Sequence, residues 1–417
     1  MAKTLVVGVD PHRKKNVVQV MDSGGQVLDR PFGVDNNRPG SQAFVRQIVA
    51  HAQADEYEAI QIATEATGWY WFHFFQTLSQ DPLLNQWPLE LYLFNPRLTA
   101  NFKHSYGDLD KTDPIDAFVV ADRFRFGRDL PVPFHYDETY LPLRFLTRHY
   151  FHLTHNLARE KAYTLAILYL KASEYTRQDK KPFTNLFGAA SRAVLQEFAS
   201  IEEIAALDFE ALVEFIDHKG KRRFADPANN AKKLQIVAQD SYPLPEALQQ
   251  PINAILALCF KHITFLEGQQ KRIKAAIAQH LEAIPHTLDT IPGIGPVFSA
   301  GLIAEIGNLA RFDYNQAKVA HFAGFKWRKA NSADFEAQQT PLTRRGNRYL
   351  RYYFCEAANA VRLHDADYAA FYDRKYHQVK KHQHKRALVL TARKLVRLVV
   401  RLLTTNQPYR PPRPPMT

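Results

Sequence analysis

Short apolar runs alternate with amphipathic stretches along the first 125 residues of the chain. Apolar runs bounded by turn residues predict strands, and apolar positions spaced by three or four residues predict helices. The predicted strands are residues 5–10, 17–21, 27–29, 59–63 and 89–94. The predicted helices are residues 42–53, residues 69–78 and a helix that opens at Asp113. The expected order is therefore β-β-β-α-β-α-β-α.

Four acidic residues occupy particular places in this order. Asp10 ends the first strand, Glu65 follows the fourth, and Asp113 and Asp116 lie at the start of the last helix. Three antiparallel strands followed by strand–helix units form the ribonuclease H topology, an α/β arrangement in which the first strand is central and ends beside the fourth. The four carboxylates are therefore expected to converge. Such oxygen ligands suit Mg²⁺, with Mn²⁺ as the alternative ion.

The segment from Lys111 to Asp116 carries the local part of this prediction. Asp113 is suited to cap the helix, and Pro114 suits the first helical position. Residues three apart share a helix face, so Asp113 and Asp116 repel each other unless a cation lies between them. Lys111 and a divalent metal ion are the two candidate cations. Taken singly, such acids are more often helix caps or solvated strand-end residues.

The middle of the chain is predicted to be helical. A connector rich in Pro, Phe and Arg spans residues 124–143, a long helix covers 146–175, and short helices with basic loops follow to residue 250. Spacings of four and three then alternate, as in a heptad repeat, at Ile252, Leu256, Cys259, Ile263, Leu266, Gln270, Ile273 and Ile277. This seam is either a coiled-coil arm for dimerisation, with Gln270 fixing the register, or the buried face of a long helix within its own domain.

Charge divides the chain into two parts. Of the net charge of +12, residues 311–417 hold 22 Lys+Arg against 7 Asp+Glu, and residues 1–310 hold 32 against 35. The basic residues of the C-terminal part alternate with aromatic residues, which favours nucleic acid over a membrane surface as the partner. No apolar run is long enough to span a bilayer, no signal peptide is recognisable, and there are only two cysteines. We therefore expect a cytoplasmic protein with no membrane partner.

A glycine-containing hairpin is predicted in the C-terminal third. Gly293 and Gly295 lie in the segment 291–296 (IPGIGP), directly before a helix expected over 297–306. The glycines permit a tight turn, and the helix N-terminus offers free N–H groups to a phosphate. This pattern is typical of a helix-hairpin-helix that contacts the DNA backbone, and a plain turn between helices is the alternative.

A serine in a basic segment is the second candidate for chemistry. Ser332 is the only serine between Ser299 and the C-terminus. A serine that attacks a phosphodiester needs cations for the charge that develops on the phosphate, although most serines in basic loops only hydrogen-bond phosphate. The basic residues of this segment are Lys326, Arg328, Lys329, Arg344, Arg345, Arg348 and Arg351.

At its N-terminal end the chain resembles the DEDD transposases of the insertion sequence 110 family, the bridge-RNA-guided recombinases. The resemblance rests on the strand that ends in Asp10, on Glu65 after a later strand, and on the Lys-Thr-Asp-x-x-Asp-Ala motif at residues 111–117. These residues look like the metal-binding acids of the family's RuvC-like domain.

The C-terminal end resembles the transposase domain of the same family. It carries Ile-Pro-Gly-Ile-Gly-Pro at 291–296, Phe-Ala-Gly at 322–324 and Arg-Gly-Asn-x-x-Leu-Arg at 345–351. Family members usually have a Ser-Gly pair before the last motif, where this chain has Ser332-Ala333. The middle of the chain carries none of the family's motifs.

The resemblance implies a domain order and a mechanism. The expected parts are a RuvC-like DEDD domain at 1–143, a helical and coiled-coil region at 144–284, a transposase domain at 285–407 and a Pro/Arg-rich tail at 408–417. A structured noncoding bridge RNA would pair with donor and target DNA, and the acids would hold Mg²⁺. Ser332 would become covalently linked to DNA, and strand exchange would pass through a Holliday-junction-like intermediate. Sites shared between protomers imply a homo-oligomer, a dimer that assembles into a tetramer on the nucleoid of a prokaryotic cell.

Two other functions stay open on the sequence alone. The first is a RuvC-like, structure-selective endonuclease that hydrolyses DNA with water and metal ions, with Ser332 only contacting phosphate. The second is a nucleic-acid scaffold whose carboxylates are structural. Covalent protein–DNA adducts distinguish the recombinase from the nuclease, and metal-dependent nicking distinguishes the nuclease from the scaffold.

Overall fold

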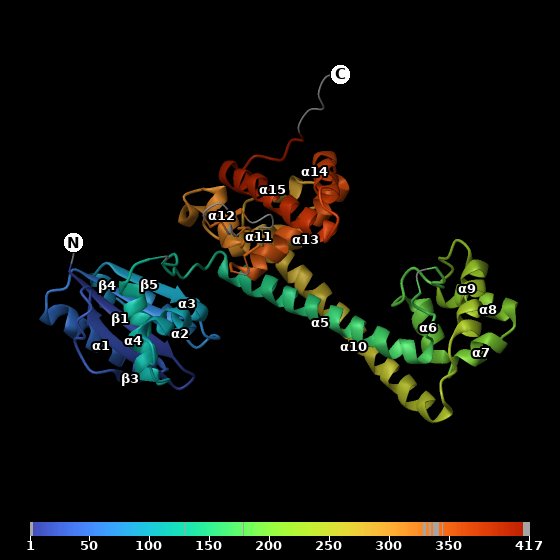
Figure 1. Cartoon of the computed structure of the whole chain (residues 1–417), viewed down its shortest axis with the longest axis horizontal. Coiled ribbons are helices and arrows are strands. Elements are labelled where there is room, and N and C mark those ends of the chain that lie inside the picture. Colours follow the sequence, from blue (N-terminus) through green and yellow to red (C-terminus); the bar gives the residue numbers. More distant parts are fainter. Residues whose placement is uncertain are drawn as a thin grey trace, which may run out of the picture. The chain divides into compact units, whose positions relative to one another are not determined.

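The computed structural model divides the chain into two compact units, Met1–Glu138 and Thr139–Thr417. It describes residues 3–128, 130–177, 179–327, 331–332, 335–336, 342–343 and 345–411. The first unit has helices on both faces of one sheet, and the second is mainly helical (Figure 1). This agrees with the predicted class, a ribonuclease H-like mixed sheet followed by a helical remainder.

A five-stranded sheet forms the centre of the first unit. Its order is β3-β2-β1-β4-β5, with β2 antiparallel to both β1 and β3, and with β1, β4 and β5 parallel. The bounds are β1 (Thr4–Pro11), β2 (Lys15–Asp22), β3 (Phe32–Asp35), β4 (Ala59–Glu65) and β5 (Leu89–Phe94). The first strand is central, as predicted, and its apolar side chains are buried on both faces, as an interior strand with helices on each side requires.

The third strand lies later in the chain than the apolar pattern predicted. Residues 27–29 form no strand, and Val27 makes only an isolated bridge to Met21. The chain then passes Pro31, which has no N–H to donate to a ladder, and β3 pairs with the other end of β2. The prediction of a strand at 27–29 is therefore wrong, because regular pairing resumes only after the proline.

Helices cover both faces of the sheet. On one face, Phe44 and Ile48 of α1 and Phe75 of α2 join the apolar side chains of β1 and β4 in a buried cluster. On the other face, Val120 and Phe124 of α4 pack against β1, β2 and β5. The bounds are α1 (Arg38–Ala54), α2 (Phe72–Ser79), α3 (Pro96–Lys103) and α4 (Asp113–Arg125).

The start of α4 corrects the predicted cap. Thr112 occupies the N-cap position in extended conformation and makes no capping hydrogen bond with its side chain. Asp113 and Pro114 are the first two residues of the helix itself. Asp113 is therefore not the cap, because the residue before it already has the extended backbone that a cap needs.

Helix α4 lies unusually close to β1 at Gly8. A Cβ atom at this position would overlap the carbonyl oxygen of Ala117 and the backbone nitrogen of Ala121, both in α4. Only glycine permits this approach, and the approach brings the first turn of α4 to the end of β1 that carries Asp10.

Two long helices, α5 and α10, form the axis of the second unit (Figure 1). They run antiparallel, with bounds α5 (Leu141–Lys171) and α10 (Glu246–Glu282). The heptad seam of α10 faces α5: Ile263 packs against Leu153, and Gln270 donates a 2.9 Å hydrogen bond from Nε2 to Thr154 Oγ1. The seam is thus buried within the chain, which is the second of the two alternatives that the sequence left open.

Each end of this helix pair carries a helical cluster with its own core. One cluster consists of α6 (Ala189–Glu197), α7 (Ile201–Ala206), α8 (Phe209–Lys219) and α9 (Pro227–Asp240). The other consists of α11 (Pro296–Ile306), α12 (Gln316–Phe322), α13 (Arg348–His364), α14 (Ala366–His377) and α15 (Gln383–Thr405). Among the helices that the structure describes, none has the length and hydropathy needed to cross a bilayer.

The close contact at Gly8 predicts an unequal response of two glycines to alanine. Gly8→Ala should destabilise the protein by about 1–3 kcal/mol, because the added methyl group overpacks the interface between β1 and α4. Gly268→Ala is the control: this glycine lies inside α10 with open space around it, so alanine should stabilise by about 0.5–1 kcal/mol. Urea unfolding measures both changes, and equal effects of the two substitutions would contradict the packing argument.

Candidate active site

Two acids reach the same edge of the sheet from neighbouring parallel strands. Val9 of β1 lies opposite Thr64 of β4, so Asp10 and Glu65, the next residue on each strand, come side by side. Thr64 Oγ1 also donates a 2.9 Å hydrogen bond to the carbonyl of Val9, which ties the two strand ends together. The pairing register thus brings together two of the four predicted carboxylates.

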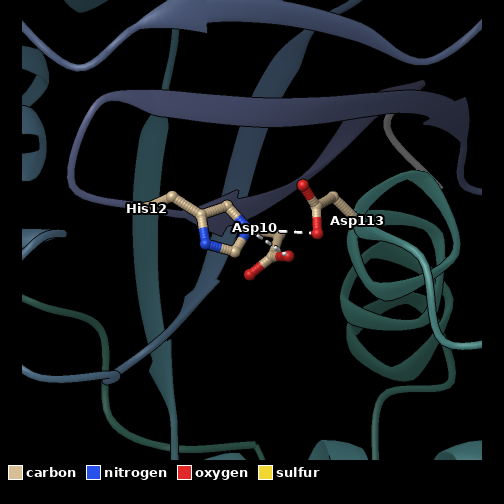
Figure 2. A group of neighbouring side chains, drawn as sticks. All are labelled: Asp10, His12 and Asp113. Atoms are coloured by element: carbon tan, nitrogen blue, oxygen red, sulfur yellow. Dashed lines mark hydrogen bonds and ion pairs between the residues drawn. The ribbon is translucent and has the colours of Figure 1, made fainter.

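The first turn of α4 adds a third carboxylate. Asp10, His12 and Asp113 each offer one ligand atom, and the three atoms lie within 4.8 Å of one another. Figure 2 shows the His12 ring beside both carboxylates. Its Nε2 is 3.0 Å from Asp10 Oδ2 and 3.4 Å from Asp113 Oδ1. The imidazole therefore bridges an acid from the sheet and an acid from the helix.

The other two predicted acids are held by neighbours from α3. Lys103 Nζ donates a 2.7 Å hydrogen bond to Asp116 Oδ1. The hydroxyl of the buried Thr99 donates to the Glu65 carboxylate. Among the described residues the lysine beside Asp116 is thus Lys103, at the end of α3, and not Lys111, which was one of the two predicted candidates along with a divalent metal ion.

Burial and mutual repulsion act on the carboxylates of the strands. The pKa of Asp10 is raised mainly because the side chain, 14% exposed, is withdrawn from water, and the nearby Asp116 and Asp113 raise it further, while His12 opposes the shift. The pKa of Glu65 is also raised, first by burial and then by the charges of Asp10 and Asp116. The negative charge of this site is therefore incompletely neutralised by the protein.

The donor set fits a small divalent cation. Asp10, Glu65, Asp113 and Asp116 supply oxygen atoms, the ligand type that Mg²⁺ and Mn²⁺ prefer, and His12 adds an imidazole nitrogen. Burial is the main cause of the two raised pKa values, and a bound cation would offset both this effect and the repulsion between the carboxylates by favouring their charged forms. The geometry brings Asp10 and Asp113 within ligand distance of a common point, whereas Glu65 and Asp116 are directed toward α3.

Sequence reasoning missed His12 and Lys103. His12 follows Asp10 by only two residues, and a histidine so close to a predicted metal ligand is itself a candidate ligand, so this signal was present in the sequence. Lys103 gave no such signal, because its contact with Asp116 spans two elements and an irregular connection. Its partner is decided by packing alone.

The C-terminal candidate, Ser332, lies in a short paired segment. Its backbone belongs to β6 (Asn331–Ser332), which pairs antiparallel with β7 (Phe335–Glu336). A bridge between Trp327 and Leu342 joins the chain on either side. Arg328, Lys329 and Arg344, predicted to contact nucleic acid, lie outside the described residues.

Two glycines allow the motifs on either side of this segment to pack closely against each other. Gly324 has φ +82° and Gly346 has φ +109°, and a Cβ at Gly346 would overlap the backbone of Gly324. Arg351 connects the backbones on either side of this contact. Its Nε donates a 3.0 Å hydrogen bond to the carbonyl of Ala323, and its Nη2 donates a 2.6 Å hydrogen bond to the carbonyl of Arg345. Phe-Ala-Gly and Arg-Gly-Asn-x-x-Leu-Arg thus form one packed unit.

A buried ion pair anchors this unit to the helices. Glu305 of α11 is 1% exposed, and its carboxylate accepts hydrogen bonds of 2.7 and 2.9 Å from Arg148 of α5. Asn347 donates a third, 2.7 Å hydrogen bond to Glu305 and caps α13 through Tyr349 and Leu350. Glu305 therefore links α5, through Arg148, to the start of α13, through Asn347.

The remaining predicted nucleic-acid contacts differ in exposure. Lys326, Arg345 and Arg348 are exposed to solvent. Gly293 has φ +90°, a conformation that residues with a side chain rarely adopt, and a Cβ atom there would overlap the backbone of α13. Both facts exclude a side chain at this position. Gly295 is the N-cap of α11 and has open space around its Cα.

Comparison with known families agrees with the two halves of this description. Residues 7–170 match the DEDD family of IS110 elements, described as a transposase, and residues 285–373 match the family described as "Transposase IS116/IS110/IS902 family". The chain belongs to the IS110 family of DEDD transposases, and it is a DNA transposase/recombinase. Comparison with curated proteins gives no match.

The family assignment accords with the site. The first matched region contains all four predicted acids, and the second contains Ser332 and the Arg-Gly-Asn motif. DEDD transposases generally depend on divalent metal ions, and the acidic cluster around Asp10 fits that requirement.

The repulsion at the acid cluster predicts that Asp10→Asn stabilises the metal-free protein, by about 0.5–2 kcal/mol, because it removes a buried charge from an acidic cluster. The same variant should lose most of the rise in melting temperature that Mg²⁺ or Mn²⁺ gives the parent protein, since a ligand is gone. Asp108→Asn removes an exposed carboxylate and should change neither quantity. Thermal melts with and without the ion measure both, and an undiminished ion effect in Asp10→Asn would exclude Asp10 as a ligand.

Proposed function

We propose that this transposase cleaves and exchanges DNA strands with the help of Mg²⁺, or alternatively Mn²⁺, held by Asp10, Glu65, Asp113 and Asp116. The observation that carries the proposal is the convergence of acids from β1, β4 and α4, with burial raising the pKa of two of them. Carboxylates gathered without enough cations are costly for folding and useful for holding a metal ion.

The chain's own residues have distinct tasks in this proposal. Asp10 and Asp113 would be the principal ligands, with His12 bridging them and fixing their orientation. Thr99 and Lys103 hold Glu65 and Asp116 in place from α3. The bound ion would supply positive charge to the non-bridging oxygens of the phosphodiester under attack.

Ser332 is proposed as the nucleophile of the strand-cleavage step. Its Oγ would form an ester bond with phosphorus while the bond from phosphorus to one sugar oxygen breaks. The serine hydroxyl would give up its proton, and the sugar oxygen would take up a proton and leave as a hydroxyl group. The ester conserves the energy of the broken phosphodiester, so the strands can be rejoined without ATP. The residues proposed to contact phosphate are Gly293, Gly295, Lys326, Arg328, Lys329, Arg344, Arg345, Arg348 and Arg351.

The partners proposed are donor DNA, target DNA and a structured noncoding bridge RNA. DNA as the substrate follows from the family. The guide RNA is proposed from the resemblance described above, and the strong positive charge of residues 311–417 suits a polyanionic partner of this kind. A structured transcript from the DNA beside the gene that co-purifies with the protein would support it.

A homo-oligomer is the last part of the proposal, a dimer that assembles into a tetramer. Since the heptad seam is used within the chain, another surface has to join the protomers. Leu258 and Phe265 of α10 are 65% and 61% exposed, and their spacing of seven residues puts them on one face of the helix. Exposed apolar side chains in register on a long helix favour contact with a second copy.

Ser332→Ala separates the recombinase from a nuclease that uses water. The variant should bind DNA as the parent does, because it lacks a single hydroxyl group, yet strand exchange and any covalent protein–DNA adduct should fall below detection. A denaturing gel with labelled DNA detects the adduct. Ser23→Ala, in an exposed turn, is the matched control and should keep full activity. Recombination by Ser332→Ala would favour the hydrolytic mechanism.

The α10 surface predicts a change of assembly in the double variant Leu258→Glu/Phe265→Glu. In the proposed dimer the introduced glutamates of one copy would lie close to those of the other and repel them. The dissociation constant of the dimer should therefore rise tenfold or more. Light scattering after size-exclusion chromatography measures the mass. Tyr242→Glu, at a residue 77% exposed before α10, is the control and should leave the mass unchanged. A double variant with the parent's mass would place the interface elsewhere.

A further inference from the structure

The outer face of α15 carries a row of four arginines. Arg386, Arg393, Arg397 and Arg401 are spaced by seven, four and four residues, so at about 100° per residue they fall within an arc of about 80°. Three of them are exposed and Arg393 is half-buried. The opposite side of the helix, including Leu395, is buried against α12, α13 and α14. We refer to these four residues as the arginine stripe.

The arginine stripe has no acidic partner among the described residues. Its polar contacts there are with uncharged oxygens: Arg397 Nε lies 3.2 Å from Gln316 Oε1, and Arg386 Nη1 lies 3.4 Å from the carbonyl of Lys375. From Arg374 to the C-terminus the sequence contains 12 Lys+Arg and no Asp or Glu. Elsewhere in the same unit, cations are neutralised, as Lys161 and Arg192 are by Glu267.

Burial and a neighbouring cation both act on Arg393, the half-buried member of the stripe. The pKa of Arg393 is lowered, first because the side chain is partly withdrawn from water and then because Arg397 is close. Two guanidinium groups held near each other without a carboxylate are stabilised when an anion binds between them. The stripe is therefore built to receive negative charge from outside the chain.

The length and surroundings of the stripe indicate the kind of anion. From Arg386 to Arg401 the helix rises about 22 Å, and a step of four residues is about 6 Å, which suits a row of backbone phosphates better than one isolated phosphate group. The side chains interleaved on this face are Leu390 and Thr404, so no aromatic ring is available to stack on the bases of a single strand. The apolar face of α15 is buried in the core, which leaves none for a lipid surface.

We infer that the arginine stripe of α15 binds the sugar–phosphate backbone of duplex DNA, as a sequence-independent contact outside both regions matched by the family comparison. The second matched region ends at residue 373, before the stripe begins. Guanidinium groups pair with phosphate oxygens through two parallel hydrogen bonds and read no bases, so the contact fixes the position of the duplex without selecting its sequence. The inference rests on the DNA transposase class and does not depend on the serine or the metal ion.

The test compares two triple variants with the same loss of charge. Arg386→Gln/Arg397→Gln/Arg401→Gln removes the three exposed arginines of the stripe. The control, Arg46→Gln/Lys232→Gln/Lys271→Gln, removes exposed cations from three other helices. Binding of several unrelated DNA duplexes is measured over a range of salt concentrations without divalent ions, in the Ser332→Ala background, so failure of the proposed chemistry leaves the result unaffected.

The stripe variant should bind every duplex more weakly, and its plot of log K against log salt should flatten by about one unit for each lost phosphate contact, up to about three units. The control should retain the parent's slope. Replacing the same three arginines by lysine should restore most of the slope, which separates lost charge from misfolding. An unchanged slope, an equal loss in the control, or a loss confined to single strands or structured RNA would each overturn the inference.

Discussion

A buried carboxylate holds the second unit of this protein together. Glu305 has almost no contact with water, and a charge in such a place is tolerated only when it is paired and fully hydrogen-bonded. Arg148 satisfies it from α5, and Asn347 satisfies it from the start of α13. Since any shift of these helices would leave a buried charge without a partner, the orientation of α5, α11 and α13 is fixed at one point. Ser332 lies in the sequence between α12 and Asn347, so the C-terminal side of its segment is joined to the chain at this point.

Acidic side chains have fewer cationic partners at the candidate active site than in the helical unit. In the helical unit, Glu305 and Glu267 are matched by arginine and lysine. At the end of β1, by contrast, the basic side chains paired with the acids among the described residues are Lys103 and His12, and burial raises the pKa of Asp10. The arginine stripe is the opposite case, with positive charge left unmatched. Because unmatched charge lowers stability, its presence at these two surfaces supports the ligands proposed above, a metal cation at the first and a phosphate backbone at the second.

Several features of the fold were predictable because they depend on residues near each other in sequence. The strands at β1, β2, β4 and β5 follow from apolar runs, and the central place of β1 follows from the order of elements. The prediction of a strand at residues 27–29 was wrong because a single proline delays the pairing with β2. The prediction of Asp113 as the cap of α4 was wrong because Asp113 is already helical and Thr112 is the N-cap. The heptad seam was visible, but repeat spacing is the same whether the partner helix belongs to this chain or to another.

The sequence by itself determined which residues are candidates for the chemistry: the acids at strand and helix ends, the glycine motifs and the basic C-terminal part. These are set by local periodicity and by residue type. Tertiary structure alone decided which neighbours those residues have. In the folded chain Asp116 accepts a hydrogen bond from Lys103 and not from Lys111. Arg351 donates hydrogen bonds to the carbonyls of Ala323 and Arg345. Such partners are separated by loops and whole elements, and side-chain contacts act over a few ångströms in space with no signature in sequence spacing.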